Sequence, residues 1–253
     1  KNFYKSNVLG TKKLLSLAIK NNVKHFSHMS SSAIFGKPKM TGANVDYANY
    51  NPTGIYGVSK YEAELEVLKN KDNFKSCSII RPRPIVGEGR LGIFEILFDW
   101  VKDHKKIPII GSGKNKFQFA HIDDLVDVSI ETSIRNLSGI FNIGTDKFDT
   151  LKNDLNAAFK IIGSRSKVFP IKKEICVSSL FILDKLSLSP LTSWHYLSYS
   201  WDFYYDQNKN FDRLIWRPKY SNVEMIVEAY NWYIKHLDQI NDDFYKLIKI
   251  NRL

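Results

Sequence analysis

The chain has 253 residues, of which 43% are hydrophobic, and its formal net charge is +11. This length and composition suit one domain, or one and a half, around a sizeable core. No apolar run reaches about 18 residues, so the sequence predicts no membrane span. The lysines are scattered rather than gathered in a stripe, which argues against nucleic acid as a partner. A basic surface can still attract an anionic substrate.

The predicted elements alternate between helices and strands. Apolar spacing indicates a helix over 7–19, a strand over 23–29, a helix from about residue 54 to 68, and a short buried strand over 77–80. The first strand runs into three serines, Ser30, Ser31 and Ser32. Near the other end of the chain, the apolar but interrupted segment 177–188 is expected to form a core or interface helix, and 223–236 a C-terminal helix.

Cysteine and histidine usage gives no sign of a metal site. Cys77 and Cys176 lie in apolar surroundings, which predicts buried thiols, a reducing compartment and hence a cytoplasmic location. His25 and His28 are three residues apart on a predicted strand and should point to opposite faces. We therefore expect no bound metal.

Tyr56 and Lys60 carry the most informative pattern. Their spacing of four residues places both side chains on one face of a helix. A phenol titrates at about 10 when unperturbed, and a fixed cation nearby lowers its pKa toward the range useful for general acid–base catalysis. A serine hydroxyl upstream could hydrogen-bond the reacting oxygen. Taken alone, the pair favours a surface lysine beside a half-buried tyrosine, and its surroundings change this interpretation.

The surroundings of this pair resemble the extended short-chain dehydrogenase/reductases, the NAD-dependent epimerase/dehydratase family. The shared order is helix, strand, serine run, loop, tyrosine–lysine helix, strand and Arg-Pro at 81–82. Ser31 stands five residues before Gly36 and 25 before Tyr56, and both spacings fit the family. The similarity continues in segments 117–125, 139–144 and 216–220, so it covers nearly the whole chain.

This resemblance implies an α/β fold with a Rossmann-type parallel sheet and a site at the carboxyl ends of its strands. The chain opens inside what resembles the family's fourth helix, so we expect the sheet to lack its first βα units and their Gly-x-x-Gly-x-x-Gly turn. Residues 1–150 are expected to form the C-terminal half of the NAD(P)-binding domain with the catalytic motif. Residues 151–253, interleaved with 82–122, are expected to form mainly a small α/β substrate-binding part.

A second glycine pattern, Gly87-x-Gly89-x-x-Gly92, is rejected as the dinucleotide fingerprint. Segment 81–84 separates it from the preceding strand and contains two prolines, which are poor central-strand residues. No acidic residue follows about 20 residues later, where the fingerprint places one on the ribose. The resemblance implies a loop on the substrate side instead.

The resemblance implies Tyr56 as the acid/base, Lys60 as its cationic partner, which also binds the nicotinamide ribose, and Ser31 as the group that polarises the reacting oxygen. A cap at the strand end is the alternative for all three serines. Cofactor contacts are expected from Tyr56, Lys60, Pro82 and Arg83, and substrate contacts from Ser32, Pro84 and Arg90. Arg83 and Arg90 could bind a diphosphate, although solvated arginines are an equal alternative.

Departures from the family's subgroups narrow the chemistry. Sugar 4,6-dehydratases carry Thr-Asp-Glu where this chain has Ser31-Ser32-Ala33, which lacks the carboxylates that eliminate water. Many sugar epimerases carry an asparagine at the position of Pro84 and Arg-Asp-Tyr at segment 117–119, which here reads Phe-Gln-Phe.

We therefore expect an epimerase or reductase that uses NAD or NADP for reversible hydride transfer on a nucleotide-sugar-like substrate, in a protein that could be a homodimer. The alternative is an inactive fragment or remnant that cannot hold a dinucleotide.

Four further side chains are expected to be structural. Asn7 is expected to cap a helix. His121 and Asp124 are expected to orient the chain and cap the helix that follows. Trp216 is expected to fix the entry to the C-terminal helix.

Overall fold

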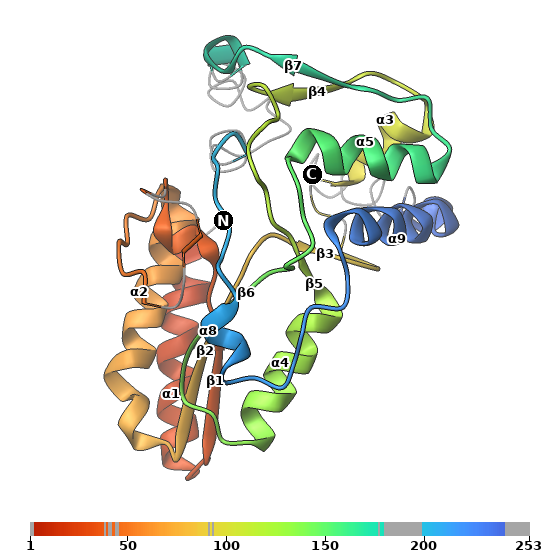
Figure 1. Ribbon diagram of the computed structural model, residues 1–253. Helices are drawn as coiled ribbons and strands as arrows, with labels where there is room; N and C mark the ends of the chain where they lie inside the picture. The colour runs from red at the N-terminus through yellow and green to blue at the C-terminus, as the bar shows by residue number, and fades with distance from the viewer. Residues whose placement is uncertain are drawn as a thin grey trace, which may run out of the picture.

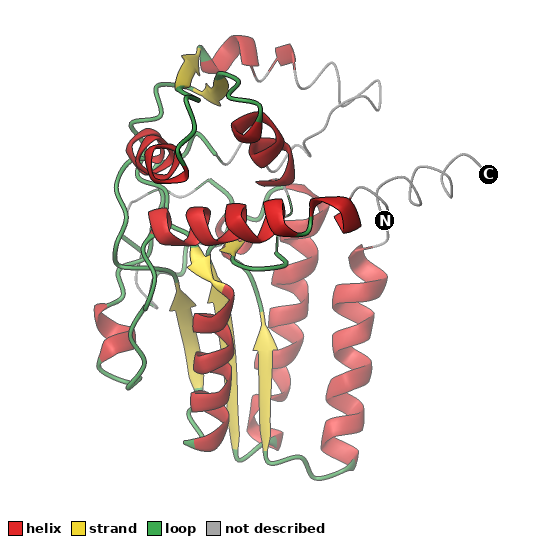
Figure 2. Cartoon of the chain, turned by 90° about the vertical axis from the view of Figure 1, so that its right-hand side faces the viewer, coloured by secondary structure: helices red, strands yellow, loops and turns green. Residues whose placement is uncertain are grey.

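A computed structural model describes residues 3–37, 39, 42–43, 46–90, 92, 94–176, 178–179 and 199–240. Apart from 178–179, the helix expected over 177–188 lies outside these residues. The described chain forms a lower part built around a parallel sheet and an upper part that lies beyond the carboxyl ends of its strands (Figures 1 and 2).

The lower part is built on a three-stranded parallel sheet in the order β1-β2-β6. Its strands are β1 (His25–Met29), β2 (Ser76–Pro82) and β6 (Gly139–Ile143). In register, Met29 lies beside Ile80, and Pro82 lies beside Ile143. Because all three strands run the same way, their carboxyl ends meet at one edge. This confirms the predicted α/β fold with a Rossmann-like sheet.

Helices cover both faces of this sheet (Figure 1). They are η1 (Tyr4–Leu9), α1 (Gly10–Lys20) and α2 (Gly54–Asn70) on one face and α4 (Ile122–Ile134) on the other. Ile79 packs with the α1 and α2 side chains, whereas its neighbour Ile80 packs with α4. Successive strand residues point to opposite faces, so β2, which is covered on both, is buried at every position.

The upper part gathers segments that are far apart in the sequence. Its elements are β3 (Ile85–Val86), α3 (Phe94–Lys102), β4 (Ile107–Ile110), β5 (Ala120–His121), α5 (Leu151–Ile162), β7 (Val168–Ile171) and α9 (Asn222–Lys235). The short helix α8 (Asn208–Phe211) lies beside β6 in the lower part, where Asn210 Nδ2 donates to Asn142 O (Figure 1). Parallel pairs form between β3 and β5 and between β4 and β7. Phe98, Phe159 and Tyr233, from α3, α5 and α9, share one core. The division at residue 150 stays a prediction.

The strand β2 continues through Pro82, further than the sequence predicted. Ile80 O accepts the Ser30 N–H on the β1 side, and Arg83 N donates to Ile143 O on the β6 side at 2.8 Å. Residues alternate between the two sides, so the nitrogen of Pro82 faces the β1 side. The last β1 residue, Met29, lies opposite Ile80, so no β1 residue stands opposite Pro82. Proline has no N–H to donate, and at this position no strand hydrogen bond is lost.

Two predicted caps are wrong and one is right. Asn7 lies inside η1 and donates Nδ2 to Ser59 Oγ at 2.9 Å, which ties η1 to α2. The cap of α4 is His121, whose ring accepts the Asp123 N–H. Asp124 lies in the first turn instead and accepts the Trp216 indole N–H at 3.1 Å. Trp216 is therefore structural, as predicted.

The thiols differ from each other. Cys77 is buried, and burial raises its pKa to about 11. Cys176 is only half-buried, so the prediction of two buried thiols is wrong for this residue, which lies on the rim of the upper part. Within the described residues, no three His, Cys, Asp or Glu side chains are grouped to hold a metal, and no helix is long and apolar enough to cross a membrane.

Candidate active site

The first half of α2 lies against the end of β1. Gly57 makes this approach close, because a Cβ at this position would stand 2.8 Å from Ala33 O. A larger residue would push the helix away from the short 3₁₀ helix η2 (Ser32–Phe35) that follows β1. The helix thereby brings Tyr56 and Lys60 to the edge where the strands end.

Lys60 is fixed in place by the strand. Its Nζ donates to Met29 O, the last carbonyl of β1, at 2.5 Å. Burial lowers the pKa of Lys60, and the negative charge of Glu64 one turn further along α2 acts in the opposite direction. The ammonium is therefore held close to the helix face that carries Tyr56.

Tyr56 is half-buried, and hydrogen bonds link its carbonyl through Ser59 to Asn7 of η1. Ser59 Oγ donates to Tyr56 O at 2.8 Å and itself accepts the Asn7 amide at 2.9 Å. The ring meets Phe3 edge-to-face at a centroid distance of 5.6 Å. The acid/base role expected for this phenol stays a prediction.

The three serines have different surroundings. Ser30 is buried and donates its hydroxyl to Glu64 Oε2 at 2.5 Å. Ser31 is half-buried and its Oγ accepts the Ala33 N–H at 3.1 Å, which makes it the cap of η2. Ser32 is buried within η2. The cap alternative thus describes Ser31, but accepting that bond leaves its own O–H hydrogen for a ligand.

A buried network that the sequence reasoning missed lies behind these residues. Glu64, 1% exposed, accepts Nε of Arg81 at 3.1 Å and also Nη2. Arg81, 0% exposed, donates Nη2 to the Tyr50 hydroxyl at 2.9 Å. The hydrogen bond and charge of Glu64 outweigh the desolvation of Arg81, whose pKa is raised. The signal available in the sequence was a carboxylate four residues after Lys60.

His28 lies in the same region without a hydrogen bond to Nε2 among the described residues. It is 8% exposed. Burial, and then the charge of Lys60, lower its pKa to about 4. The imidazole is therefore neutral at physiological pH.

The predicted cofactor and substrate residues beyond β2 have contrasting environments. Arg83 is buried between aromatic rings, with its guanidinium carbon 5.0 Å from the Phe117 centroid and 4.8 Å from that of Phe203, and burial lowers its pKa to about 10. Pro84 is half-buried, whereas Arg90 is exposed. Arg83 and Arg90 therefore do not share one solvated face as a diphosphate clamp would require.

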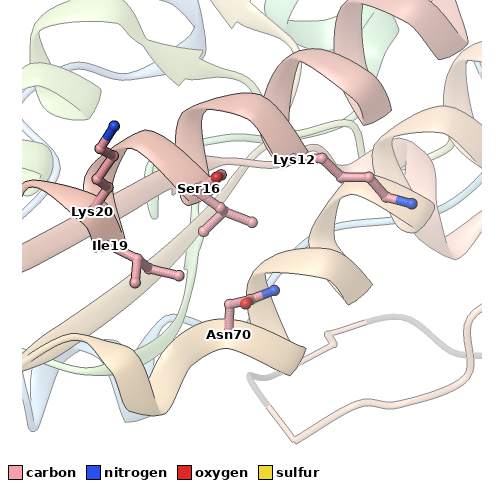
Figure 3. A pocket seen from close by; sticks show the side chains of 6 residues that line it. Lys12, Ser16, Ile19, Lys20 and Asn70 are labelled. Atoms are coloured by element: carbon pink, nitrogen blue, oxygen red, sulfur yellow. The ribbon is translucent and has the colours of Figure 1, made fainter.

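Two grooves lie away from this edge. One, of about 430 Å³, is lined by α1 and the end of α2, including Lys12, Ser16, Lys20 and Asn70 (Figure 3). The other, of about 460 Å³, is lined by Glu88 with Glu224 and Glu228 of α9 among others. Three carboxylates beside the Gly87–Gly92 loop do not suit a pyrophosphate, which argues against a dinucleotide site there.

The family is decided by direct comparison. A model of the NAD dependent epimerase/dehydratase family matches residues 1–144. The chain belongs to this family. It is 36% identical over 237 residues to the uncharacterized protein y4nG of Sinorhizobium fredii, covering 91% of this chain and 58% of that protein. It is 32% identical over 162 residues to the N-acetyl-α-D-glucosaminyl-diphospho-ditrans,octacis-undecaprenol 4-epimerase of Escherichia coli O157:H7, covering 61% of this chain and 47% of that protein.

Solved structures support the same fold. The UDP-glucuronic acid 4-epimerase of Bacillus cereus in complex with NAD superposes with a TM-score of 0.71 at 22% identity, over 91% of this chain and 68% of that one. MoeE5 in complex with UDP-glucose and NAD gives a TM-score of 0.70 at 19% identity, over 91% and 72%. The chain spans about half the length of the two sequence relatives named above.

Proposed function

We propose that this chain forms the catalytic part of an NAD-dependent enzyme that epimerises a sugar carried on a diphosphate, by reversible hydride transfer. The observation that carries the proposal is the pairing of Tyr56 and Lys60 on one face of α2, with Lys60 Nζ held on the last carbonyl of β1. Ser31 stands two residues beyond that carbonyl. Oxidoreduction without epimerisation is the nearest alternative within the same chemistry.

In this proposal Tyr56 moves the proton at the carbinol oxygen. The fixed charge of Lys60 favours the phenolate, which accepts the proton as the alcohol is oxidised and returns it when the ketone is reduced. The O–H of Ser31 hydrogen-bonds the same oxygen and orients it between the two side chains. Ser30 cannot take this part, because its hydroxyl is bound to Glu64.

The residues at the strand ends fit the nicotinamide end of NAD. When bound, NAD supplies the hydride acceptor and donor. Tyr56, Lys60 and the backbone near Pro82 would hold its ribose and ring, since they form the rim at the carboxyl ends of β1 and β2. Arg83, although buried, adds a positive charge behind this rim.

What two relatives share supports the proposed substrate class. The Escherichia coli protein acts on a sugar linked to undecaprenyl diphosphate, and the Bacillus cereus protein is named for UDP-glucuronic acid. Both are 4-epimerases of a sugar attached to a diphosphate. The exposed Arg90 and the net charge of +11 suit such an anionic substrate.

A dehydratase is the second candidate, because the chain is 29% identical over 175 residues to the dTDP-D-glucose 4,6-dehydratase of Dictyostelium discoideum. Ser32 and Ala33 argue against it. Neither side chain carries the carboxylate that would remove and deliver the protons of water elimination, and Ser32 is buried.

Product analysis separates these candidates. The full product of the gene would be incubated with NAD and, in turn, UDP-glucuronic acid, UDP-N-acetylglucosamine and the undecaprenyl-diphosphate sugar, and the products would be identified by NMR. We expect the C4 epimer of at least one substrate. Formation of a 4-keto-6-deoxy sugar from a dTDP- or GDP-hexose would contradict the assignment, as would the absence of any conversion.

A further inference from the structure

Glu64 lies on the same face of α2 as Tyr56 and Lys60. Glu64 follows Lys60 by four residues, so all three lie along one face of α2. Glu64 is 1% exposed, although carboxylates are almost never fully buried unless they are paired. The groups that it binds explain the burial.

Glu64 binds the ends of two strands at once. Ser30, which precedes Ser31, donates its hydroxyl to Glu64 Oε2 at 2.5 Å. Arg81, which precedes Pro82 on β2, donates Nε to the same oxygen at 3.1 Å and Nη2 to the other. One carboxylate therefore connects the helix that carries the acid/base to the serine run and to the rim of the expected cofactor site.

The guanidinium of Arg81 also contacts two aromatic rings and a hydroxyl, although its buried Nη1 has no hydrogen-bond partner among the described residues. Its central carbon lies 5.3 Å from the ring centroid of Phe35 and 5.0 Å from that of Tyr50, and Nη2 donates to the Tyr50 hydroxyl at 2.9 Å. A forked pair of this kind fixes direction as well as distance. Glu64 therefore cannot rotate or slide without breaking several bonds.

The energetics of a buried ion pair favour a role in placement over one in stability. Desolvating two charges costs nearly as much as their attraction returns, and well-packed apolar side chains often replace such a pair without loss of stability. A pair that contributes little net free energy can still select one arrangement of the elements it joins.

We propose that Glu64 is a positioning residue that, through Ser30 and Arg81, sets α2 so that Tyr56 and Lys60 face the serine run correctly. For its catalytic consequence this rests on the proposed function. Among the described residues, the charged and titratable groups around this face of α2 include Arg81 of β2, His28 of β1, Tyr50 and Tyr205. Glu64 also acts on Lys60 directly, because its negative charge opposes the lowering of the Lys60 pKa by burial.

The decisive variant removes the pair but keeps the core. Glu64→Leu combined with Arg81→Met replaces both charges with apolar groups, so we expect a thermal midpoint near that of the unmodified protein. Turnover should nevertheless fall on the order of 100-fold, with the substrate KM within about threefold, because the reacting groups are misplaced rather than lost. If the pair served stability alone, a stable double variant would keep its turnover, and the proposal would be overturned.

Glu62→Gln is the matched control, since it neutralises a half-buried carboxylate of α2 two positions away and on another face. We expect its turnover and thermal midpoint to stay unchanged. A loss of turnover in Glu62→Gln as large as in the double variant would show that any charge change on α2 suffices, and would contradict a specific role for Glu64.

A second readout needs no turnover. Competitive acetylation of Lys60 across pH, followed by mass spectrometry of the 253-residue chain, reports the titration of its amine. We expect the Lys60 pKa to fall in Glu64→Gln and to recover in part in Glu64→Asp. An unchanged Lys60 titration in folded variants would overturn the proposal. Inactivity of the unmodified full product of the gene would instead count against the proposed function, and the Lys60 titration would still apply.

Discussion

A neutral side chain of β1 and a charged side chain of α2 lie near each other at the end of β1. His28 is 8% exposed and uncharged, whereas Lys60 keeps an ammonium on the next carbonyl, that of Met29. Burial without a carboxylate partner disfavours the charged form of histidine. The protonation of His28 therefore links the stability of the fold to pH.

We predict that acid destabilises the fold through His28. Its pKa is about 4 in the folded chain and 6.5 without burial. Above 6.5 neither state binds the proton, so stability is complete. As the pH falls from 6.5 to about 4, the unfolded state alone takes up a proton, and the free energy of unfolding drops by about 3 kcal/mol at most.

Urea unfolding at pH 7 and pH 4.5 checks this, with His28→Leu as the comparison. The variant should lose less stability than the unmodified chain between the two pH values, by about 2–3 kcal/mol. Equal losses in the two proteins would show that His28 is not the group that titrates.

At the residue scale, sequence reasoning found the pair Tyr56 and Lys60 because it rests on local helical spacing. It missed Arg81 as a partner of Glu64 and Tyr50 as a partner of Arg81. Their contacts join residues 17 to 31 positions apart along the chain. Such contacts depend on how the strands and α2 pack, which no local pattern encodes.

Among the elements, α4 is hydrogen-bonded to segment 215–216, which lies about 80 to 90 residues further along the chain. Glu131 accepts the backbone N–H groups of Ile215 at 2.7 Å and Trp216 at 2.9 Å, and Asp124 accepts the Trp216 indole at 3.1 Å. Asp124 is 1% exposed, and burial raises its pKa despite these bonds. The indole contact thus satisfies a carboxylate that has little access to water.

We predict that Trp216→Phe lowers the free energy of unfolding by about 1–3 kcal/mol, because it leaves one lone pair of buried Asp124 without a donor. Trp232→Phe is the control, since this half-buried tryptophan of α9 stacks on His236. Chemical denaturation monitored by circular dichroism gives both values. A loss no larger for Trp216→Phe than for Trp232→Phe would contradict the role given to the indole.

The elements that could be predicted are those with a clear local period. The helix over 223–236 and the strand over 77–80 agree with α9 and β2 to within a few residues. The pairing of β4 with β7 could not be predicted, because each has four residues and they are joined across about 60 positions. The extension of β2 through Pro82 escaped prediction for a related reason, since it depends on where β1 ends.

For the whole molecule, the central question is how much of the cofactor the 253 residues can hold. Among the described strands of the main sheet, β1 is at the edge and pairs only with β2. The Gly-x-x-Gly-x-x-Gly turn of the family does not occur in this sequence. Helix N–H groups at such a turn normally hold the pyrophosphate.

We therefore predict that the 253-residue chain binds NAD weakly. Tyr56, Lys60 and the backbone near Pro82 would contact the nicotinamide end alone. Loss of the contacts to the pyrophosphate and adenosine should weaken the binding free energy by several kcal/mol. Because about 1.4 kcal/mol corresponds to a tenfold change, a micromolar dissociation constant would move toward millimolar. Isothermal titration calorimetry decides the point. A low micromolar constant would mean that another loop cradles the cofactor, with Gly87–Gly92 the first to test by substitution.

Replacement of Tyr56 by phenylalanine in the full product of the gene tests the assigned chemistry most directly. Steady-state epimerisation and NAD affinity would be measured for both proteins under identical conditions. Loss of the phenol should reduce turnover on the order of 10²–10⁴-fold, while NAD affinity stays within a few fold because the ring and its contact with Phe3 remain. Turnover near that of the unmodified enzyme would show that Tyr56 is not the acid/base.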